Sequence, residues 1–322
     1  MYERKGIILE PEGKIGAIFN PGATEYDGEI ILLPRIVEKG YTKLQGNAFT
    51  EYISHIRIAK STDGINFKLN KEYFIKASTK DLDDYGAEDA RVTKLGTEYL
   101  ITYTAIDEPL PQTDHIRIGL ATTKDFKEVK KRGIFGPNFR TKAGIIFPEV
   151  FDDNQIFFLF KNESGIEHMN YAYMDKSMLH DKKKRDEFWL YYKQEENIFL
   201  TKQDNEWEDH GVEPGPQPIK TEHGWLLLYS AISKKPAWSV GAMLLDLKQP
   251  HKILAKTKKP IIIPKEGYEE RGGDVDDVIF PEGVIDKFGK LFLYYGASDK
   301  YCCLATIDKE FLIEKLLKYN EN

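Results

Sequence analysis

The segment GTEYLITYTA (residues 96–105) places a turn glycine before a run of aliphatic and aromatic residues, a pattern typical of a strand that follows a hairpin turn. The same pattern occurs five times along the 322-residue chain. The copies are Gly28 with EIILLPR, Gly96 with TEYLITYTA, Asn154 with QIFFLFKN, Gly224 with WLLLYSA and Gly289 with KLFLYYGA. Their starts lie 68, 58, 70 and 65 residues apart. Five repeats of this size predict an all-β fold, a five-bladed β-propeller.

Each copy is followed by a second apolar run that reads as another strand. These runs span residues 56–61, 116–123, 169–174, 240–247 and 302–307. Because a propeller blade cannot bury both of its faces alone, we expect one closed domain over residues 1–322. The C-terminal run DKEFLIEKLLKY (308–319) fits either a helix or a strand that closes the ring.

The composition excludes several classes of partner. A net charge of −6 gives no basic surface for nucleic acid. The basic stretches KEVKKR (127–132) and DKKKRDE (181–187) contain acids as well, so we expect solvated loops there. The N-terminal apolar run is too short for a signal peptide or membrane span, which predicts a cytoplasmic protein. Two adjacent cysteines and scattered histidines predict no disulfide, metal or other cofactor.

A polar residue stands just upstream of each repeat. Counting back seven or eight residues from the turn gives Asn20, Asp89, Gln217 and Glu282, while the shorter third copy offers Glu149. One strand of each propeller blade lines the common axis. We therefore expect these side chains to converge on one funnel.

The acidic segment around Asp89 is the strongest candidate for catalysis. Glu88, Asp89 and Arg91 lie at the start of a predicted strand, directly after Gly86 and Ala87. Burial among other acids would favour a protonated Asp89, and an arginine could keep a neighbouring carboxylate ionised. The alternative is a turn aspartate that caps its own backbone. The recurrence of polar residues at this position favours a functional role.

Further acids lie in rigid, proline-containing segments. Glu282 and Glu149 each follow Phe-Pro, and Glu213 lies in GVEPGPQP (211–218). Two carboxylates that flank one pocket meet the requirement for cleaving a glycosidic bond. The abundant Tyr, Phe and Trp residues would mostly be core, although some could offer flat surfaces to sugar rings.

Several ordered motifs resemble one carbohydrate-active family. The chain resembles glycoside hydrolase family 130 from about residue 15 to residue 307. The motifs that carry the resemblance are FNPGA (19–23), IRIAKSTDGINF (56–67), EDARVTKLGTEYLITYTA (88–105), GPQPIKTEHGWLLLY (215–229) and YYGASDKYCCLAT (294–306). The resemblance implies a five-bladed propeller that cleaves β-mannosides with inversion, either by phosphate or by water.

The resemblance also implies roles for individual residues. Asp89 matches the family's proton donor, which acts through a sugar hydroxyl, although Ala90 replaces the usual proline. Asn20, Arg35 and Arg57 match residues that hold the mannosyl unit, and Asp299 lies near the same sugar. Glu88, next to the proton donor, is counted among the substrate-binding residues.

The departures from the family pattern favour water as the nucleophile. Phosphorylase motifs are replaced by Thr141-Lys142-Ala143, Phe160-Lys161 and Tyr229-Ser230-Ala231. Lys142 and Lys161 remain as nearby cations, but lysine lacks the bidentate geometry with which arginine binds phosphate. The first expectation is therefore an inverting, exo-acting β-mannosidase that cleaves β-1,2-linked mannooligosaccharides by attack of water. Asp89 would be the acid, and Glu213 or Glu282 the base that activates water.

Two alternatives stay open. One is a β-mannooligosaccharide phosphorylase that releases α-mannose 1-phosphate, with Lys142 and Lys161 binding inorganic phosphate. The other is a sugar-binding propeller without catalysis, because fold alone does not settle function. In either enzyme the partner is a β-mannoside oligosaccharide, with no nucleic acid or membrane, and a homo-oligomer stays open. Loops 36–54, 107–115 and 177–206 are expected to shape the subsite of the leaving sugar.

Overall fold

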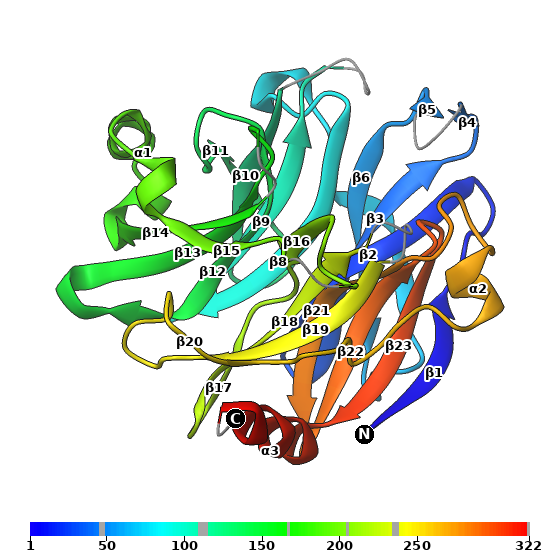
Figure 1. The fold of residues 1–322 in the computed structure, drawn as a ribbon. Helices are drawn as coiled ribbons and strands as arrows, with labels where there is room; N and C mark the ends of the chain where they lie inside the picture. Colours follow the sequence, from blue (N-terminus) through cyan, green and yellow to red (C-terminus); the bar gives the residue numbers. More distant parts are fainter. Residues whose placement is uncertain (45–48, 109–114, 166–167, 204–205, 234–237, 321–322) are drawn as a thin grey trace.

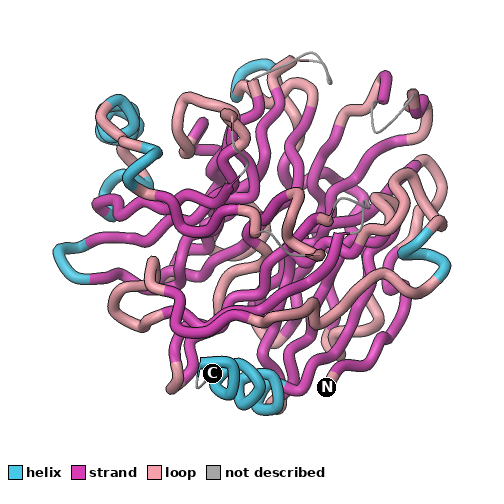
Figure 2. The backbone as a smooth tube through the Cα atoms, viewed as in Figure 1, coloured by secondary structure: helices cyan, strands magenta, loops and turns pink. Residues whose placement is uncertain are grey.

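The computed structural model describes residues 1–322 except 45–48, 109–114, 166–167, 204–205, 234–237 and 321–322. Strands dominate the described chain, and the helices lie at its periphery (Figures 1 and 2). The predicted all-β class is confirmed. Parts of the predicted loops 36–54, 107–115 and 177–206 lie outside the described residues.

The main strands form antiparallel groups in chain order. The first group contains β2 (Ile15–Tyr26), β3 (Glu29–Glu38), β6 (Ser54–Ser61) and β7 (Lys68–Ile75). The second contains β8 (Gly86–Leu95), β9 (Glu98–Ile106), β10 (Ile116–Thr123) and β11 (Lys130–Ile134). These two groups share one eight-stranded sheet, because Ser54 of β6 pairs in parallel with Gly86 of β8. A short hairpin of β4 (Thr42–Lys43) and β5 (Phe49–Thr50) projects from the first group.

The remaining groups follow the same pattern. The third contains β12 (Thr141–Phe151), β13 (Gln155–Asn162), β14 (His168–Asp175) and β15 (Ile198–Thr201). The fourth contains β16 (Gly211–Pro214), β17 (Ile219–Thr221), β18 (Gly224–Ile232), β19 (Trp238–Leu245) and β20 (Ile253–Lys256). The fifth contains β21 (Ile279–Lys287), β22 (Lys290–Ala297), β23 (Tyr301–Asp308) and the N-terminal β1 (Tyr2–Leu9). The five repeats of the sequence are therefore β3, β9, β13, β18 and β22.

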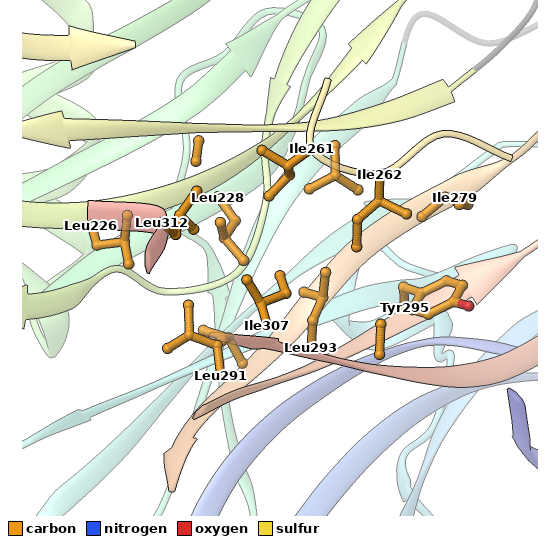
Figure 3. Close-up of a cluster of buried hydrophobic side chains, with 14 of the residues drawn as sticks. Leu226, Leu228, Ile261, Ile262, Ile279, Leu291, Leu293, Tyr295, Ile307 and Leu312 are labelled. Carbon is orange, nitrogen blue, oxygen red and sulfur yellow. The ribbon is translucent and has the colours of Figure 1, made fainter. Parts of the chain in front are cut away.

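The N-terminal strand completes the sheet formed by the C-terminal strands. Strand β1 runs antiparallel to β23, with Tyr2 opposite Ile307 and Leu9 opposite Cys302. The C-terminal run whose state was left open is the helix α3 (Lys309–Asn320). Its Leu312 packs with Leu226, Leu291 and Ile307 in a buried cluster (Figure 3). Burying each such side chain contributes about 1.5–3 kcal/mol, so this helix is fixed by packing across groups four and five.

The prediction that the two basic stretches are solvated loops holds for residues 127–129 but was wrong for the rest. Residues 130–132 belong to β11, and residues 182–187 begin the helix α1 (Lys182–Leu190). Asp181 caps this helix by accepting a hydrogen bond from the backbone N–H of Lys184. Arg185 is buried and donates to the carbonyls of Met178 and Arg132 at 2.7 and 2.8 Å. The second basic stretch therefore forms a helix, and the hydrogen bonds of Arg185 hold the buried face of this helix in place.

The first strands of neighbouring groups meet one another. Strand β2 contacts β21 and β8, β8 contacts β12, and β12 contacts β16. Bulges interrupt pairing in these strands, and three bulge residues have positive φ: Asn20 (48°), Asp89 (53°) and Ala143 (53°). A bulge turns a side chain away from its regular direction. The fold thus brings Asn20, Asp89 and the neighbours of Ala143 to one region.

A further helix, α2 (Gly267–Glu270), lies between groups four and five in the chain. No described helix combines the length and apolar character needed to cross a membrane.

Candidate active site

A cavity of about 1030 Å³ lies where the groups meet. Its volume is at the upper end of small-molecule sites, enough for more than one sugar ring. Six of the ten predicted site residues line it: Asn20, Arg35, Glu88, Asp89, Lys142 and Asp299. Every one of the five strand groups contributes at least one lining residue.

Asp89 is held by directed hydrogen bonds on one side of the cavity. Its Oδ1 accepts from Asn20 Nδ2 at 2.9 Å and from Arg35 Nη1 at 3.3 Å. The same guanidinium donates to Glu88 Oε1 at 2.6 Å and to Ser54 Oγ at 3.1 Å. Ser54 in turn donates to Glu88 Oε1 at 2.6 Å. We call Asn20, Arg35, Ser54, Glu88 and Asp89 the carboxylate floor.

The carboxylate floor is shielded from water, which alters its protonation. The Arg35 guanidinium lies 4.7 Å from the centre of the Phe19 ring and 5.2 Å from that of Tyr52. Burial raises the pKa of Glu88 to about 7, against the opposing effect of Arg35. Burial likewise raises the pKa of Asp299 to about 6. The carboxyls around Asp89 therefore retain protons close to neutral pH.

A second acidic pair lies behind the cavity wall. Arg91 Nη2 is 2.9 Å from Glu282 Oε1 and 3.9 Å from Glu213 Oε1, and all three side chains are almost fully buried. Arg91 also donates to the carbonyls of Gly215 and Pro214. Burial raises the pKa of Glu282 well above its ordinary value, despite Arg91. Glu282 is fully buried and is not among the described residues that line the cavity, so its role as the base stays a prediction.

Cations from the third group gather at another part of the cavity lining. Lys142 Nζ lies 3.4 Å from Glu163 Oε1 and 3.6 Å from Glu213 Oε2. Lys161 Nζ lies 3.2 and 3.3 Å from the same two oxygens, and Arg140 Nε is 3.0 Å from Glu163 Oε2. We call Arg140, Lys142, Lys161, Glu163 and Glu213 the cation wall.

Only part of the cation wall faces the open cavity. Arg140, Lys142 and Glu163 line it, whereas Lys161 and Glu213 are 2% and 1% exposed. Burial alone would raise the pKa of Glu163, but Lys142, Lys161 and Arg140 hold it below its ordinary value. Burial would lower the pKa of Lys142, but Glu163 and Glu213 raise it. Charges on this wall are therefore mutually stabilised.

Three residues expected near the funnel lie elsewhere. Arg57 rests on the Tyr73 ring, 4.7 Å from its centre, and is not among the described residues that line the cavity. Glu149 is half-exposed and pairs with Lys220. Gln217 Nε2 donates to the carbonyls of Ala23 and Val284, so it ties β2 to β21. The spacing upstream of the repeats therefore identified Asn20 and Asp89, whereas the residues that it gave in groups three, four and five are not among the described residues that line the cavity.

Several lining residues were missed from the sequence. Arg140 directly precedes β12, and Glu163 directly follows β13. Neither residue belongs to a motif that distinguishes it in the sequence from other charged residues near strand ends. Tyr52, Tyr85, Trp238 and Phe280 also line the cavity, and only the general excess of aromatics hinted at them. Described residues from the predicted loop 177–206 instead line a separate cavity of about 560 Å³ beside α1.

The site has no metal-binding character in the described residues. No group of three or more His, Cys, Asp or Glu side chains there is arranged to hold a metal ion. The site contains the hydrogen-bonded carboxylate of Asp89, neighbouring carboxyls with raised pKa values, and the cations of the cation wall. Such a set can protonate a leaving oxygen and accommodate an anion.

Comparison with known proteins identifies the family. Residues 3–318 match the model of glycoside hydrolase family 130, described as β-1,4-mannooligosaccharide phosphorylase. The chain belongs to this family. Within it, the chain is 30% identical to a β-1,2-mannobiose phosphorylase of Listeria innocua, over 88% of this chain and 86% of the relative. It is also 30% identical to a 1,2-β-oligomannan phosphorylase of Thermoanaerobacter, over 93% and 92% of the two chains.

Solved structures agree with the family assignment. The Listeria innocua β-1,2-mannobiose phosphorylase in complex with β-1,2-mannobiose superposes with a TM-score of 0.82 and 25% identity, covering 98% of this chain and 99% of the other. A solved structure from a study of glycoside hydrolases of this family that target β-1,2-mannosidic linkages in Candida mannan shares the fold, with a TM-score of 0.78 and 24% identity. That structure covers 96% of this chain and 94% of its own.

Proposed function

We propose that this protein cleaves β-mannosidic linkages by phosphorolysis, releasing mannose 1-phosphate. One observation carries the choice of phosphate: the cations Arg140 and Lys142 line the cavity that contains Asp89. The two glutamates expected to activate water, Glu213 and Glu282, are instead almost fully buried, and neither is among the described residues that line the cavity. The first expectation, hydrolysis, therefore becomes the second candidate.

In this proposal the carboxylate floor binds the mannosyl unit and supplies the proton. A phosphate oxygen attacks the anomeric carbon, the bond from that carbon to the leaving oxygen breaks, and inversion gives the α-phosphate. The leaving oxygen receives a proton from Asp89, directly or through a sugar hydroxyl. Burial raises the pKa of the neighbouring carboxyls of Glu88 and Asp299 to about 7 and about 6.

The relatives support the phosphorylase choice. Two relatives that are each 30% identical to this chain are named as phosphorylases of β-1,2-linked mannosides. A further relative, 25% identical over 98% of this chain, is a 4-O-β-D-mannosyl-D-glucose phosphorylase of Bacteroides fragilis. That relative acts on a different compound, so the relatives do not agree on one substrate. A β-1,2-linked mannoside is the first substrate to test.

Hydrolysis stays as the second candidate because of the carboxylates in the cation wall. Glu163 pairs with Arg140 and Lys142, and Glu213 lies within 3.6 Å of both lysines. Each carboxylate would compete with phosphate for these cations. Glu163, which faces the cavity with a lowered pKa, would then orient water as an ionised group.

We propose that the five strand groups are blades of one propeller domain spanning residues 1–322. The contacts that link β2, β8, β12, β16 and, through β18, β21 support a ring. The pairing of β1 with β23 would close it. In this arrangement the cavity lies at one end of the propeller axis.

The proposal is tested with β-1,2- and β-1,4-mannobiose, incubated with and without phosphate. Phosphorolysis predicts mannose 1-phosphate only when phosphate is present. Mannose formed at the same rate without phosphate would reverse the order of the two candidates. If neither product forms while mannobiose still binds, the protein is a sugar-binding propeller without catalysis.

A further inference from the structure

The cavity contains an apolar surface that the proposed chemistry does not use. Tyr85, Ile106 and Ile116 line it from the second strand group. Ile106 ends β9 and pairs with Ile116, the first residue of β10, while the N–H of Tyr85 donates to the Ile106 carbonyl at 2.9 Å. The three residues are thus neighbours at one end of this group, close to the ends of the strands labelled β9 and β10 in Figure 1.

Tyr85 differs from the other two because its ring is accessible. Ile106 and Ile116 are 2% and 5% exposed, whereas Tyr85 is 38% exposed. An aromatic ring that faces a cavity offers a flat, rigid surface to the apolar face of a sugar. The cost of ordering it on binding is small because the ring has few rotatable bonds.

The segment before Tyr85 is anchored by a buried carboxylate. Asp83 is fully buried, accepts from the backbone N–H of Ser78 at 2.7 Å, and accepts from Tyr103 Oη at 3.0 Å. Lys131 Nζ, on β11, lies 2.7 Å from the same residue. These contacts fix the backbone two residues ahead of Tyr85, which restricts the region that its side chain can occupy.

The chemistry of inversion assigns a role to this surface. The nucleophile and the leaving oxygen lie on opposite sides of the anomeric carbon in an inverting displacement. The anion would bind at the cation wall, which is built by β12, β13 and the residues beside them, and the mannosyl unit at the carboxylate floor. The apolar surface belongs to neither, and it adjoins β8, the strand that carries the proton donor Asp89.

Resting on the proposed function, we infer that Tyr85 is the stacking platform for the leaving sugar and sets the preference for a saccharide leaving group. Ile106 and Ile116 line the cavity at the same end of the group, and the Ile106 carbonyl accepts a hydrogen bond from the Tyr85 backbone. The Asp83 anchor acts as a positioning contact for the platform. Tyr85 therefore contributes to binding of the sugar beyond the cleaved bond rather than to the proton transfer.

The test compares two substrates that share the mannosyl unit but differ in leaving group. β-1,2-Mannobiose presents a sugar to Tyr85, whereas β-mannosyl fluoride presents a single atom. Tyr85→Ala should lower kcat/KM for mannobiose about three- to tenfold more than for the fluoride, mainly through KM. Tyr85→Phe, which keeps the ring, should retain the wild-type ratio. Tyr191→Ala removes a ring that is 75% exposed outside this cavity and serves as the matched control.

Any other result would contradict either the role inferred for Tyr85 or the proposed function, and the experiment distinguishes the two. An equal loss for both substrates would show that Tyr85 acts on the mannosyl unit or on the fold, and the inference would fall. A Tyr85→Phe variant as impaired as Tyr85→Ala would replace stacking by a hydroxyl contact. Wild-type protein that cleaves neither substrate would overturn the proposed function itself, whereas failure of the inference alone leaves wild-type turnover intact.

Discussion

The carboxylate floor and the cation wall face the same cavity but are built in different ways. In the floor, one arginine fork binds two carboxylates, and Ser54 and Asn20 complete directed bonds of 2.6–3.3 Å. In the wall, two lysines share Glu163 and Glu213 at 3.2–3.6 Å. A guanidinium fixes geometry, whereas an ammonium acts as a compact charge on a flexible stem. The floor is thus suited to one fixed ligand pose, and the wall to an anion that enters and leaves.

The largest effect is expected when the proposed proton donor, Asp89, is removed from the carboxylate floor. Asp89→Asn should lower kcat by about 10²–10⁴-fold, because general acid catalysis contributes that much. The amide has nearly the same shape, so the unfolding temperature should change little. Steady-state rates with mannobiose and phosphate, beside a thermal melt, measure both. Turnover near the wild-type rate would move the proton donor to another residue.

Removing the Arg35 guanidinium from the carboxylate floor should also lower the free energy of unfolding. Arg35→Met leaves Glu88 and Asp89 without their shared partner, and breaking a buried ion pair costs about 3–5 kcal/mol. Denaturant unfolding measures this loss. Arg57→Met is the matched control, because Arg57 lies against Tyr73 outside the cavity. Equal effects of the two substitutions on mannoside binding would restore Arg57 to the site predicted from the sequence.

The cation wall should respond through phosphate rather than through the sugar. Lys142→Met should raise KM for phosphate about tenfold, since one charged contact to an anion is worth about 1.5 kcal/mol or more, with a smaller change in KM for the mannoside. Lys220→Met removes an exposed lysine paired with Glu149 and controls for net charge. Initial rates at varied phosphate measure the effect. An unchanged phosphate KM would place the anion elsewhere or favour hydrolysis.

The smallest expected effect concerns stability against pH. Burial raises the pKa of Glu88 from 4.5 to about 7, so its stabilising contribution is complete below about pH 4.5 and is lost as pH rises through 7. Asp299, with a pKa of about 6, acts in the same direction. Glu88→Gln should therefore flatten the decline of melting temperature between pH 5 and pH 8. A decline as steep as in the wild type would contradict the assignment to Glu88.

The sequence predicted the strands better than the site, for physical reasons. A turn residue followed by an apolar run is a local signal, and it located β3, β9, β13, β18 and β22. The helix α1 was missed because its inward face includes Arg185, whose partners are distant carbonyls that no local pattern reveals.

The site was predicted where one motif carries it. Glu88 and Asp89 were found together because they are adjacent in the chain. Asn20 was found through the repeat spacing and the resemblance, and Arg35 through the resemblance alone. Glu163 and Arg140 were missed because they meet only when strands β12 and β13 pair. Glu213 and Glu282 are buried beside Arg91, and this burial decides whether they can contact a ligand. It depends on how neighbouring strands pack, which the sequence does not show.

The pairing of β1 with β23 has a consequence for how the protein matures. Tyr2 can meet Ile307 only after nearly the whole chain has been made, and contacts of such long sequence separation form slowly. The cavity likewise needs Asn20 from the first strand group and Asp299 from the last. Recovery of activity during refolding would therefore report the final closing step, while recovery of strand signal alone would report earlier, local hairpins.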